Sequence, residues 1–200
     1  MSRIRLVPLQ CPGCNHPLAA GVGEHLLATC DDCGTTCEVV RGVPMPRERT
    51  IYRPRSGSPT EFVPFWRFET RVEVRRREAA GMGQLFKDLF KPGQDGWQAE
   101  LSFFVPALDV SLGAFQLLSL KMLRRGKDIL EPWEPAPALP IHPTAMSMDE
   151  ASRTLEFILL TIEAHQPDML VHLDFSVDIL ASGVALIPAT VTGKSVQLLV

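Results

Sequence analysis

Cysteine is absent from most of this 200-residue chain, because all five cysteines lie between residues 11 and 37. The sequence also lacks any uninterrupted apolar run of about 18 residues, the length that a membrane-spanning helix needs. Its first ten residues, MSRIRLVPLQ, contain no apolar segment followed by a small-residue cleavage site, as a secretory leader would. These absences argue against a transmembrane segment, and we expect a soluble, cytoplasmic protein.

A strong charge imbalance is also missing. The net charge is −3, with +3 in residues 1–78 and −6 in residues 79–200. Proteins that bind nucleic acid mainly through electrostatics carry a clear excess of basic residues, so this balance argues against that class. Hydrophobic residues make up 46% of the chain and charged residues 22%. That composition argues against a disordered protein and predicts a globular core.

Motifs of the common enzyme classes are missing as well. The sequence contains no G-x-S-x-G, no H-E-x-x-H, no glycine-rich phosphate loop and no dinucleotide fingerprint. The G-K-S of VTGKSV (191–196) lacks the preceding glycine and the following helix of a phosphate loop, so we expect a hairpin turn there. We therefore expect a protein that is not an enzyme, with no catalytic residue to name.

What the sequence does contain is a pair of C-x2-C motifs separated by fifteen residues. Zinc takes four ligands in tetrahedral geometry, with sulfur at about 2.3 Å, and each C-x2-C turn directs two sulfurs to one ion. We therefore expect Zn²⁺ to be bound by Cys11, Cys14, Cys30 and Cys33. Iron uses the same four thiols and is the less favoured alternative, because the chain has no partner redox motif. A disulfide pair would need an oxidising compartment.

Four protein ligands leave no coordination position open for water or substrate. An open position is what makes a zinc ion catalytic, so the expected zinc is structural. Gly13 and Gly34 suit the two C-x2-C turns, because glycine tolerates a positive φ that a side chain would penalise.

The fifth cysteine and two nearby histidines have other expected roles. Cys37 alternates with Thr36 and Glu38 in the strand-like segment TTCEVV, and we expect it to be a small buried residue rather than a ligand. His16 and His25 could in principle replace a thiol. Because four better-spaced cysteines are available, we expect both histidines at the surface or beside the ligands.

This N-terminal segment resembles the short zinc ribbons whose last strand runs into a V-x-x-G-I-P turn. Such ribbons occur in the small activator subunits of tRNA and ribosomal methyltransferases, in some bacterial methyltransferases and in uncharacterised bacterial proteins. The resemblance covers about residues 4–46 and implies a ribbon fold, zinc and contact with another protein. Val43 replaces the usual Ile, Cys37 replaces the usual aromatic residue, and no methyltransferase signature follows. The matching residues are Leu9, Cys11, Pro12, Cys14, Cys30, Cys33, Val39, Gly42, Val43 and Pro44.

The whole sequence predicts an α+β protein, in which the ribbon is followed by an antiparallel-sheet domain with two main helices. We expect the ribbon in residues 1–46, a linker rich in Arg, Pro, Ser and Gly in 47–61, and the α+β domain in 62–200. Residues 66–75 and 170–179 alternate between apolar and polar side chains, which predicts half-buried strands. Their outer faces carry complementary charges, which would favour pairing of the two strands.

Two helices are expected in that domain. Residues 111–125 form the first, with Gly126 as its C-terminal stop and basic residues in its last turn. Residues 147–166 form the second, which begins with Ser147 and Glu150 in capping-box spacing.

The segment 81–97 has apolar residues at helical spacing and lysines on the opposite side. Such a stripe packs on its own sheet or docks on a partner protein, and both interpretations stay open. Docking on a membrane surface is less favoured, because only two lysines are available for anionic lipid. The candidate partner-binding residues are Met82, Leu85, Phe86, Leu89 and Phe90.

Together these features favour a non-catalytic adaptor or accessory subunit of a larger protein complex, with structural zinc in its ribbon. The alternative is a ribbon that binds nucleic acid. Salt-sensitive phosphate contacts would then come from Arg3, Arg5, Arg41, Arg47, Arg49, Arg53 and Arg55. Aromatic residues for base stacking are sparse here, since Tyr52 is the only one in the first sixty residues.

Overall fold

The computed structural model of the chain describes residues 9–18, 27–79, 91–92, 97–164, 170–193 and 195–200. In the first part of the chain, a three-stranded antiparallel sheet follows the order β1-β2-β3. Its strands are β1 (Leu27–Thr29), β2 (Thr36–Val40) and β3 (Val43–Arg47). The turn between β2 and β3 places Arg41 and Gly42 at φ values of 51° and 79°. Positive φ at both central residues is typical of a type I′ hairpin. We call residues 9–47 the ribbon.

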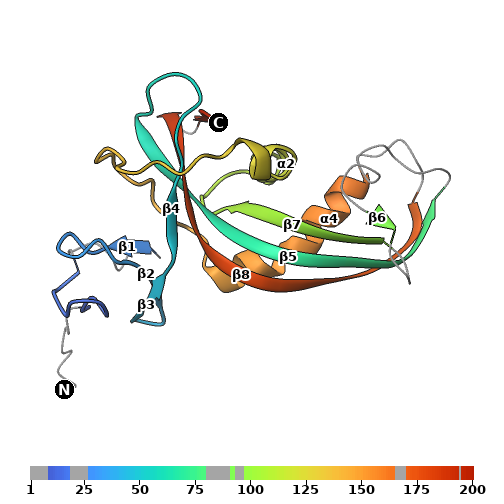
Figure 1. Cartoon of the computed structure of the whole chain (residues 1–200), viewed down its shortest axis with the longest axis horizontal. Helices are drawn as coiled ribbons and strands as arrows, with labels where there is room; N and C mark the ends of the chain where they lie inside the picture. Colours follow the sequence, from blue (N-terminus) through green and yellow to red (C-terminus); the bar gives the residue numbers. More distant parts are fainter. Residues whose placement is uncertain (1–8, 19–26, 80–90, 93–96, 165–169, 194) are drawn as a thin grey trace, which may run out of the picture.

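A larger sheet forms the body of the protein, and its main strands follow the order β4-β8-β5-β7-β6, with β9 also paired to β8. All its pairs are antiparallel except that of β4 with β8. Figure 1 shows the ribbon beside β4, at one end of the long strands. The strands are β4 (Arg49–Ile51), β5 (Glu61–Ala79), β6 (Lys91–Pro92), β7 (Trp97–Pro106), β8 (Leu170–Thr192) and β9 (Ser195–Leu198).

The two alternating segments of the sequence are the central strands β5 and β8, and they pair with each other. Val72 stands opposite Val177, and the exposed Arg75 forms an ion pair with Asp174 at 3.1 Å. The alternation in β5 places its apolar residues inside the protein, and Trp66 and Phe68 are at most 1% exposed. The predicted strands and their pairing are therefore confirmed.

One inward position in β8 differs from the sequence pattern. Ile179, the last apolar residue of the alternating run, is 45% exposed. The ladder shifts register here, because Glu69 pairs with Ala181 while Thr70 pairs with Ile179, and Leu180 is left as an extra residue. At this bulge Ile179 lines an open cavity instead of entering the core.

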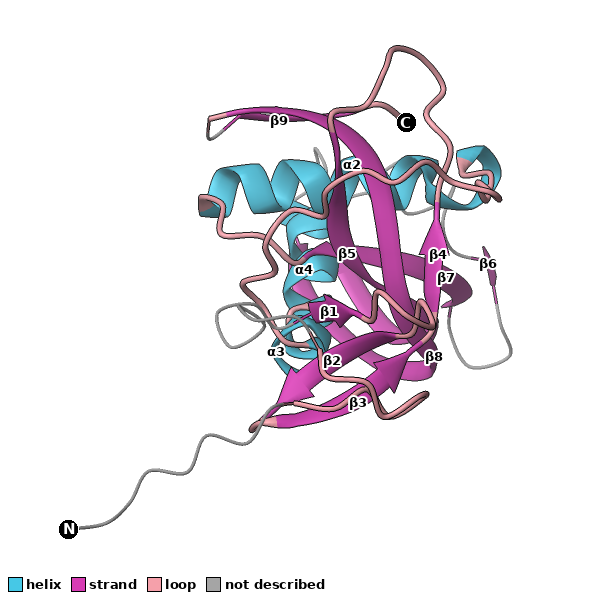
Figure 2. Ribbon diagram, turned by 90° about the vertical axis from the view of Figure 1, so that its left-hand side faces the viewer, coloured by secondary structure: helices cyan, strands magenta, loops and turns pink. Residues whose placement is uncertain are grey.

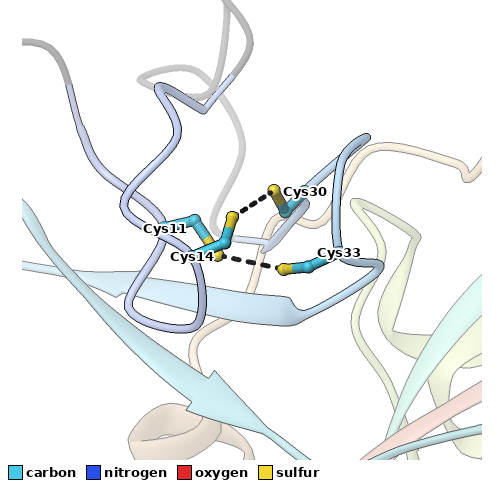
Figure 3. Close-up of side chains that lie close together, drawn as sticks. All are labelled: Cys11, Cys14, Cys30 and Cys33. Atoms are coloured by element: carbon cyan, nitrogen blue, oxygen red, sulfur yellow. Dashed lines mark hydrogen bonds between the residues drawn. The ribbon is translucent and has the colours of Figure 1, made fainter.

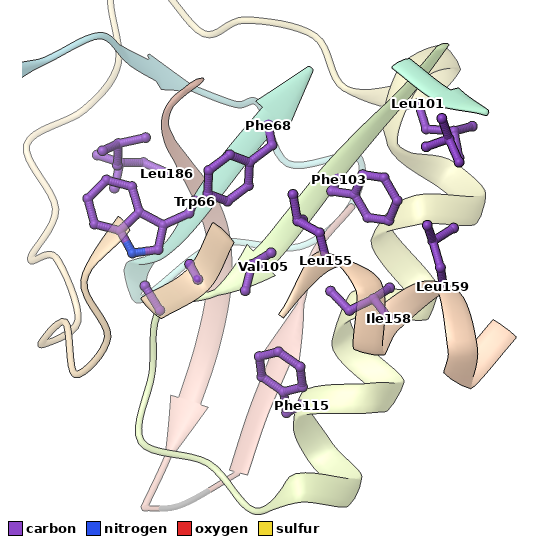
Figure 4. Packing of buried hydrophobic residues seen from close by; sticks show 14 of the residues in the cluster. Trp66, Phe68, Leu101, Phe103, Val105, Phe115, Leu155, Ile158, Leu159 and Leu186 are labelled. Carbon is purple, nitrogen blue, oxygen red and sulfur yellow. The ribbon is translucent and has the colours of Figure 1, made fainter. Parts of the chain in front are cut away.

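The helices are α2 (Leu112–Ile129), α3 (Met148–Arg153) and α4 (Leu155–Ala164). Helices α3 and α4 pack against one face of the large sheet (Figure 2), whereas α2 contributes Phe115 to the core on that face and Met122 to a second core on the other. Side chains from these helices fill a core with the inner residues of β5 and β7, as Figure 4 shows for Phe115, Leu155, Ile158 and Leu159. This arrangement confirms the predicted α+β class.

The helix boundaries differ from the sequence-based expectation. α2 continues through Gly126 and ends at Ile129, with Leu130 as its C-cap. Glycine inside a helix costs only about 1 kcal/mol relative to alanine, which is small beside the packing of a helix that buries Phe115 and Met122. The second predicted helix is interrupted at Thr154, whose hydroxyl donates to the carbonyl of Ala151 at 2.7 Å.

The segment expected to be a linker, residues 47–61, contains strand β4. Arg49, Thr50 and Ile51 stand opposite Val184, Ala185 and Leu186 of β8. The adjoining backbone of Glu48 accepts a hydrogen bond from the N–H of Val184 at 2.8 Å. The chain therefore leaves the ribbon directly into the large sheet.

Candidate metal centre

The four cysteines of the two C-x2-C motifs converge at the N-terminal end of the molecule (Figure 3). All four sulfur atoms lie within 4.8 Å of one another. The closest pairs join the two motifs, with Cys11 and Cys33 at 3.5 Å and Cys14 and Cys30 at 3.6 Å. The structure thus brings together all four of the predicted metal ligands.

The two loops that carry these cysteines have the same backbone geometry. In the first, the N–H of Asn15 donates to the carbonyl of Cys11 at 2.8 Å; in the second, the N–H of Gly34 donates to the carbonyl of Cys30 at 2.9 Å. The N–H of each leading cysteine donates in turn to a carbonyl five residues on, that of His16 or Thr35. Two equivalent turns therefore face each other, each offering two sulfurs.

Positive φ occurs at the residue that follows each second cysteine. Asn15 has a φ of 62° and Gly34 a φ of 71°, and asparagine is among the residues that tolerate this region best. The expectation for Gly34 is confirmed, whereas Gly13 is needed for a different reason. A Cβ at Gly13 would lie 2.7 Å from Oγ1 of Thr35 in the opposite loop, so glycine is required there by close approach.

The donor set fits a tetrahedral metal ion. Four sulfurs at about 2.3 Å from one ion would lie about 3.8 Å from one another, close to the shorter separations found here. Cys11 and Cys30 are buried and Cys33 is exposed, so an ion at the centre would lie near the surface. Cys11, Cys14, Cys30 and Cys33 would hold it, and zinc and iron both accept such a set.

The thiols differ in how readily they lose a proton. The hydroxyl of Thr35 lies 3.1 Å from Sγ of Cys33, and this hydrogen bond, with one from the Thr35 backbone and with the neighbouring cysteines, lowers the pKa of Cys33 to about 6. Burial raises the pKa of Cys37 to about 11, so that residue remains a thiol. Cys37 is fully buried in β2, which confirms its expected place in the strand.

His16 lies at the rim of the cluster. Its Nδ1 is 2.6 Å from Oδ2 of Asp32, and both side chains are exposed. Because Asp32 belongs to the second loop, this pair links the two loops at the surface, as expected for a residue beside the ligands. His25 lies outside the described residues.

Glu38 connects the ribbon to the rest of the protein and was not identified from the sequence. Its side chain is 1% exposed, and Oε2 accepts from Nη2 of Arg47 at 2.6 Å. Oε1 accepts from the backbone N–H of Met148, the first residue of α3, at 2.8 Å. The sequence did contain a signal for this contact, because Glu38 is an acidic residue at the centre of a short strand and an arginine, Arg47, lies in the next strand.

The arginines proposed as phosphate contacts differ in whether their side chains are bonded to other residues or exposed. Arg47 is held by Glu38, and Nη1 of Arg49 donates to the hydroxyl of Thr29 at 3.4 Å. Arg41, Arg53 and Arg55 are exposed. Arg3 and Arg5 lie outside the described residues, as do all five candidate partner-binding residues: Met82, Leu85, Phe86, Leu89 and Phe90.

Among the helices of the described residues, none is both long and apolar enough to cross a membrane. Comparisons of the chain with models of known protein families, with curated proteins and with solved structures found no match.

Proposed function

We propose that this protein is a non-catalytic, cytoplasmic accessory subunit whose ribbon is held in shape by a structural zinc ion. The observation that carries the proposal is the closed donor set, in which four sulfurs lie within 4.8 Å of one another. With all four positions of a tetrahedral ion taken by protein, no position is left for a substrate.

The composition of the ribbon supports a structural role for the metal. Among the described residues of the ribbon, the buried apolar cluster comprises Cys11, Leu18, Ala28 and Cys30, with Leu9 and Cys14 packed against it. So small a core cannot by itself offset the conformational entropy of an ordered segment. Bound zinc would supply that free energy, because the ligands come together only in the folded chain.

The surface of the ribbon supports a role in protein contact. Val43 is 60% exposed and Met45 is 42% exposed, and both lie in β3, next to the hairpin turn. Since β2 anchors the ribbon to α3 through Glu38, these apolar side chains are presented on a fixed surface. The apolar stripe of residues 82–90, which lies outside the described residues, is the second segment that we propose for a partner.

The metal is tested first, on the full chain purified without chelator. We expect about one zinc and no iron per chain by elemental analysis. All five thiols should react with a thiol reagent only after zinc is removed, because unfolding of the ribbon also exposes Cys37. Iron as the main metal would overturn the assignment of zinc. No tightly bound metal at all would overturn the proposal as a whole.

The accessory role is tested by tagged purification at near-physiological salt, with and without nuclease. We expect a stoichiometric protein partner that survives nuclease and is lost from the variant Met45→Asp. The variant Leu117→Asp is the matched control, because Leu117 is 72% exposed but lies on α2, away from the ribbon. A chain that retains only nucleic acid, or a monomer without any partner, would contradict the proposal.

A further inference from the structure

A cavity of about 270 Å³ lies where the ribbon meets the large sheet. Three parts of the chain line it: Leu27, Thr29 and Thr36 of the ribbon, Val184 and Leu186 of β8, and residues of the connector 139–144. Most of the wall is apolar, and the polar atoms come from a few threonines and one histidine. Ligand pockets have this character, a largely apolar wall with a small number of placed polar groups.

The histidine in the wall is oriented by a carboxylate behind it. Nδ1 of His142 lies 2.8 Å from Oε2 of Glu61, and both side chains are half-buried. A carboxylate accepts hydrogen bonds, so Nδ1 carries a proton that it donates to Glu61, and Nε2 is the second hydrogen-bonding atom of the ring. Nε2 has no hydrogen bond to any residue that the structure describes.

A second polar group in the wall also lacks a protein partner. Thr144 is 4% exposed and lines the cavity, and its hydroxyl makes no hydrogen bond with the described part of the chain. The hydroxyls of Thr29 and Thr36, in contrast, lie 3.2 Å apart and bond to each other. Among the described residues, Ser119 Oγ rather than Thr144 Oγ1 is the buried side-chain oxygen without a partner. The Thr144 hydroxyl is therefore accessible from the cavity and can bond to whatever fills it, water or a ligand.

We propose that this cavity binds a small organic molecule with an apolar body and a single hydroxyl group. The hydroxyl donates to Nε2 of His142 and accepts from Thr144, while the apolar body contacts the leucine, isoleucine and valine side chains. The volume equals that of about nine water molecules, which corresponds to a ligand of roughly ten non-hydrogen atoms.

The ribbon forms one side of this cavity, so ligand binding is coupled to the metal. Leu27, Thr29 and Thr36 lie in β1 and β2, the strands that follow the first and second cysteine loops. If the metal is removed and the ribbon loses its fold, the cavity opens to solvent. The ligand should therefore bind the metal-loaded chain and not the metal-free chain.

The test uses 2-phenylethanol as the probe and ethylbenzene, which lacks the hydroxyl, as its control, both added to the metal-loaded full chain. We expect saturable binding of 2-phenylethanol with a Kd on the order of 1 mM, and amide NMR shifts centred on His142, Thr144 and Val184. Ethylbenzene should bind at least fivefold more weakly. Absence of saturation would mean that the cavity holds water only and would overturn the proposal.

Two variants distinguish the loss of a hydrogen bond to the ligand from a change in the fold. Thr144→Val keeps the shape of the side chain but removes the hydroxyl, and should weaken binding of 2-phenylethanol at least fivefold while leaving zinc content and Tm unchanged. Thr192→Val, at the exposed end of β8, is the matched control and should bind as the wild type does. Equal affinity in Thr144→Val, or binding that persists in the metal-free chain, would overturn the assignment. Neither result depends on whether the protein has a partner.

Discussion

Oε1 of Glu38 in the ribbon accepts a hydrogen bond from the backbone N–H of Met148 at the start of α3, at 2.8 Å. The other oxygen of the same carboxylate binds Arg47 through Nε at 2.9 Å and Nη2 at 2.6 Å. One buried side chain thus joins two strands of the ribbon to the first turn of a helix in the α+β body. The fold of the ribbon and the position of α3 are therefore linked.

Replacing Glu38 by alanine should destabilise the protein by about 3 kcal/mol, because the change leaves the Arg47 guanidinium and the Met148 N–H without their acceptor. Urea unfolding of the metal-loaded chain measures the change. The control is Glu48→Ala, since the carboxylate of Glu48 is 71% exposed and lies 3.6 Å from Arg67; such exposed pairs contribute less than about 1 kcal/mol. Equal effects of the two substitutions would contradict the role assigned to Glu38.

Replacing Cys14 or Cys30 by serine should abolish stoichiometric zinc binding, because the tetrahedral set then loses a thiolate. Cys37→Ala is the matched control, as it removes a buried thiol from the same sheet without removing a ligand. We expect elemental analysis to give about one zinc per chain for Cys37→Ala and close to none for the serine variants. Retained zinc in both serine variants would refute the ligand assignment.

Gly13→Ala should weaken metal binding, because the added methyl group would lie 2.7 Å from Oγ1 of Thr35. The double variant Gly13→Ala/Thr35→Ala removes the obstructing oxygen and should recover part of the affinity. Competition with a coloured zinc chelator measures both. If the second substitution brings no recovery, close approach is not the reason for glycine at this position.

The main strands could be predicted because their burial follows a simple local period. From Trp66 to Val74 of β5, each buried residue is followed by a charged one, so the sequence alone reveals the inner face of this part of the strand. The pairing of β5 with β8 could also be predicted, since the charges of the two outer faces are complementary. Arg75 does form an ion pair with Asp174. The metal ligands were predictable for a similar reason, because each of the two loops is defined by a local C-x2-C motif.

Features that depend on distant contacts were not predictable. Glu38 alternates with Cys37 and would face solvent in an isolated ribbon, yet the α+β body covers that face and buries it. Gly126 carries a local stop signal that packing of the rest of α2 overrides. The bulge that exposes Ile179 arises from the pairing of two long strands. The sequence of either strand by itself does not predict it.

Ser147→Ala should raise the pKa of Glu150. A hydrogen bond from the Ser147 hydroxyl to Oε2 at 2.7 Å, together with one from its backbone N–H, holds the pKa of Glu150 below the ordinary value. The stabilisation that goes with this shift is present above the pKa of the unfolded chain and is lost as the pH falls through the folded pKa. Carbon NMR titration of the Glu150 carboxyl measures the change. Ser111→Ala removes the N-cap of α2 instead and should leave that pKa unaltered.

Removal of the metal should destabilise not only the ribbon but also the first turn of α3. Without the metal the ribbon lacks enough core to stay folded, so Glu38 no longer accepts from Met148. Hydrogen exchange of the Met148 amide should then accelerate at least tenfold, since its acceptor is gone. The amide of Ile158, bonded in α4 to the carbonyl of Thr154 at 2.9 Å, should change much less. Equal acceleration of both amides would indicate that chelation unfolds the whole domain, and no acceleration at Met148 would show that the ribbon keeps its fold without metal.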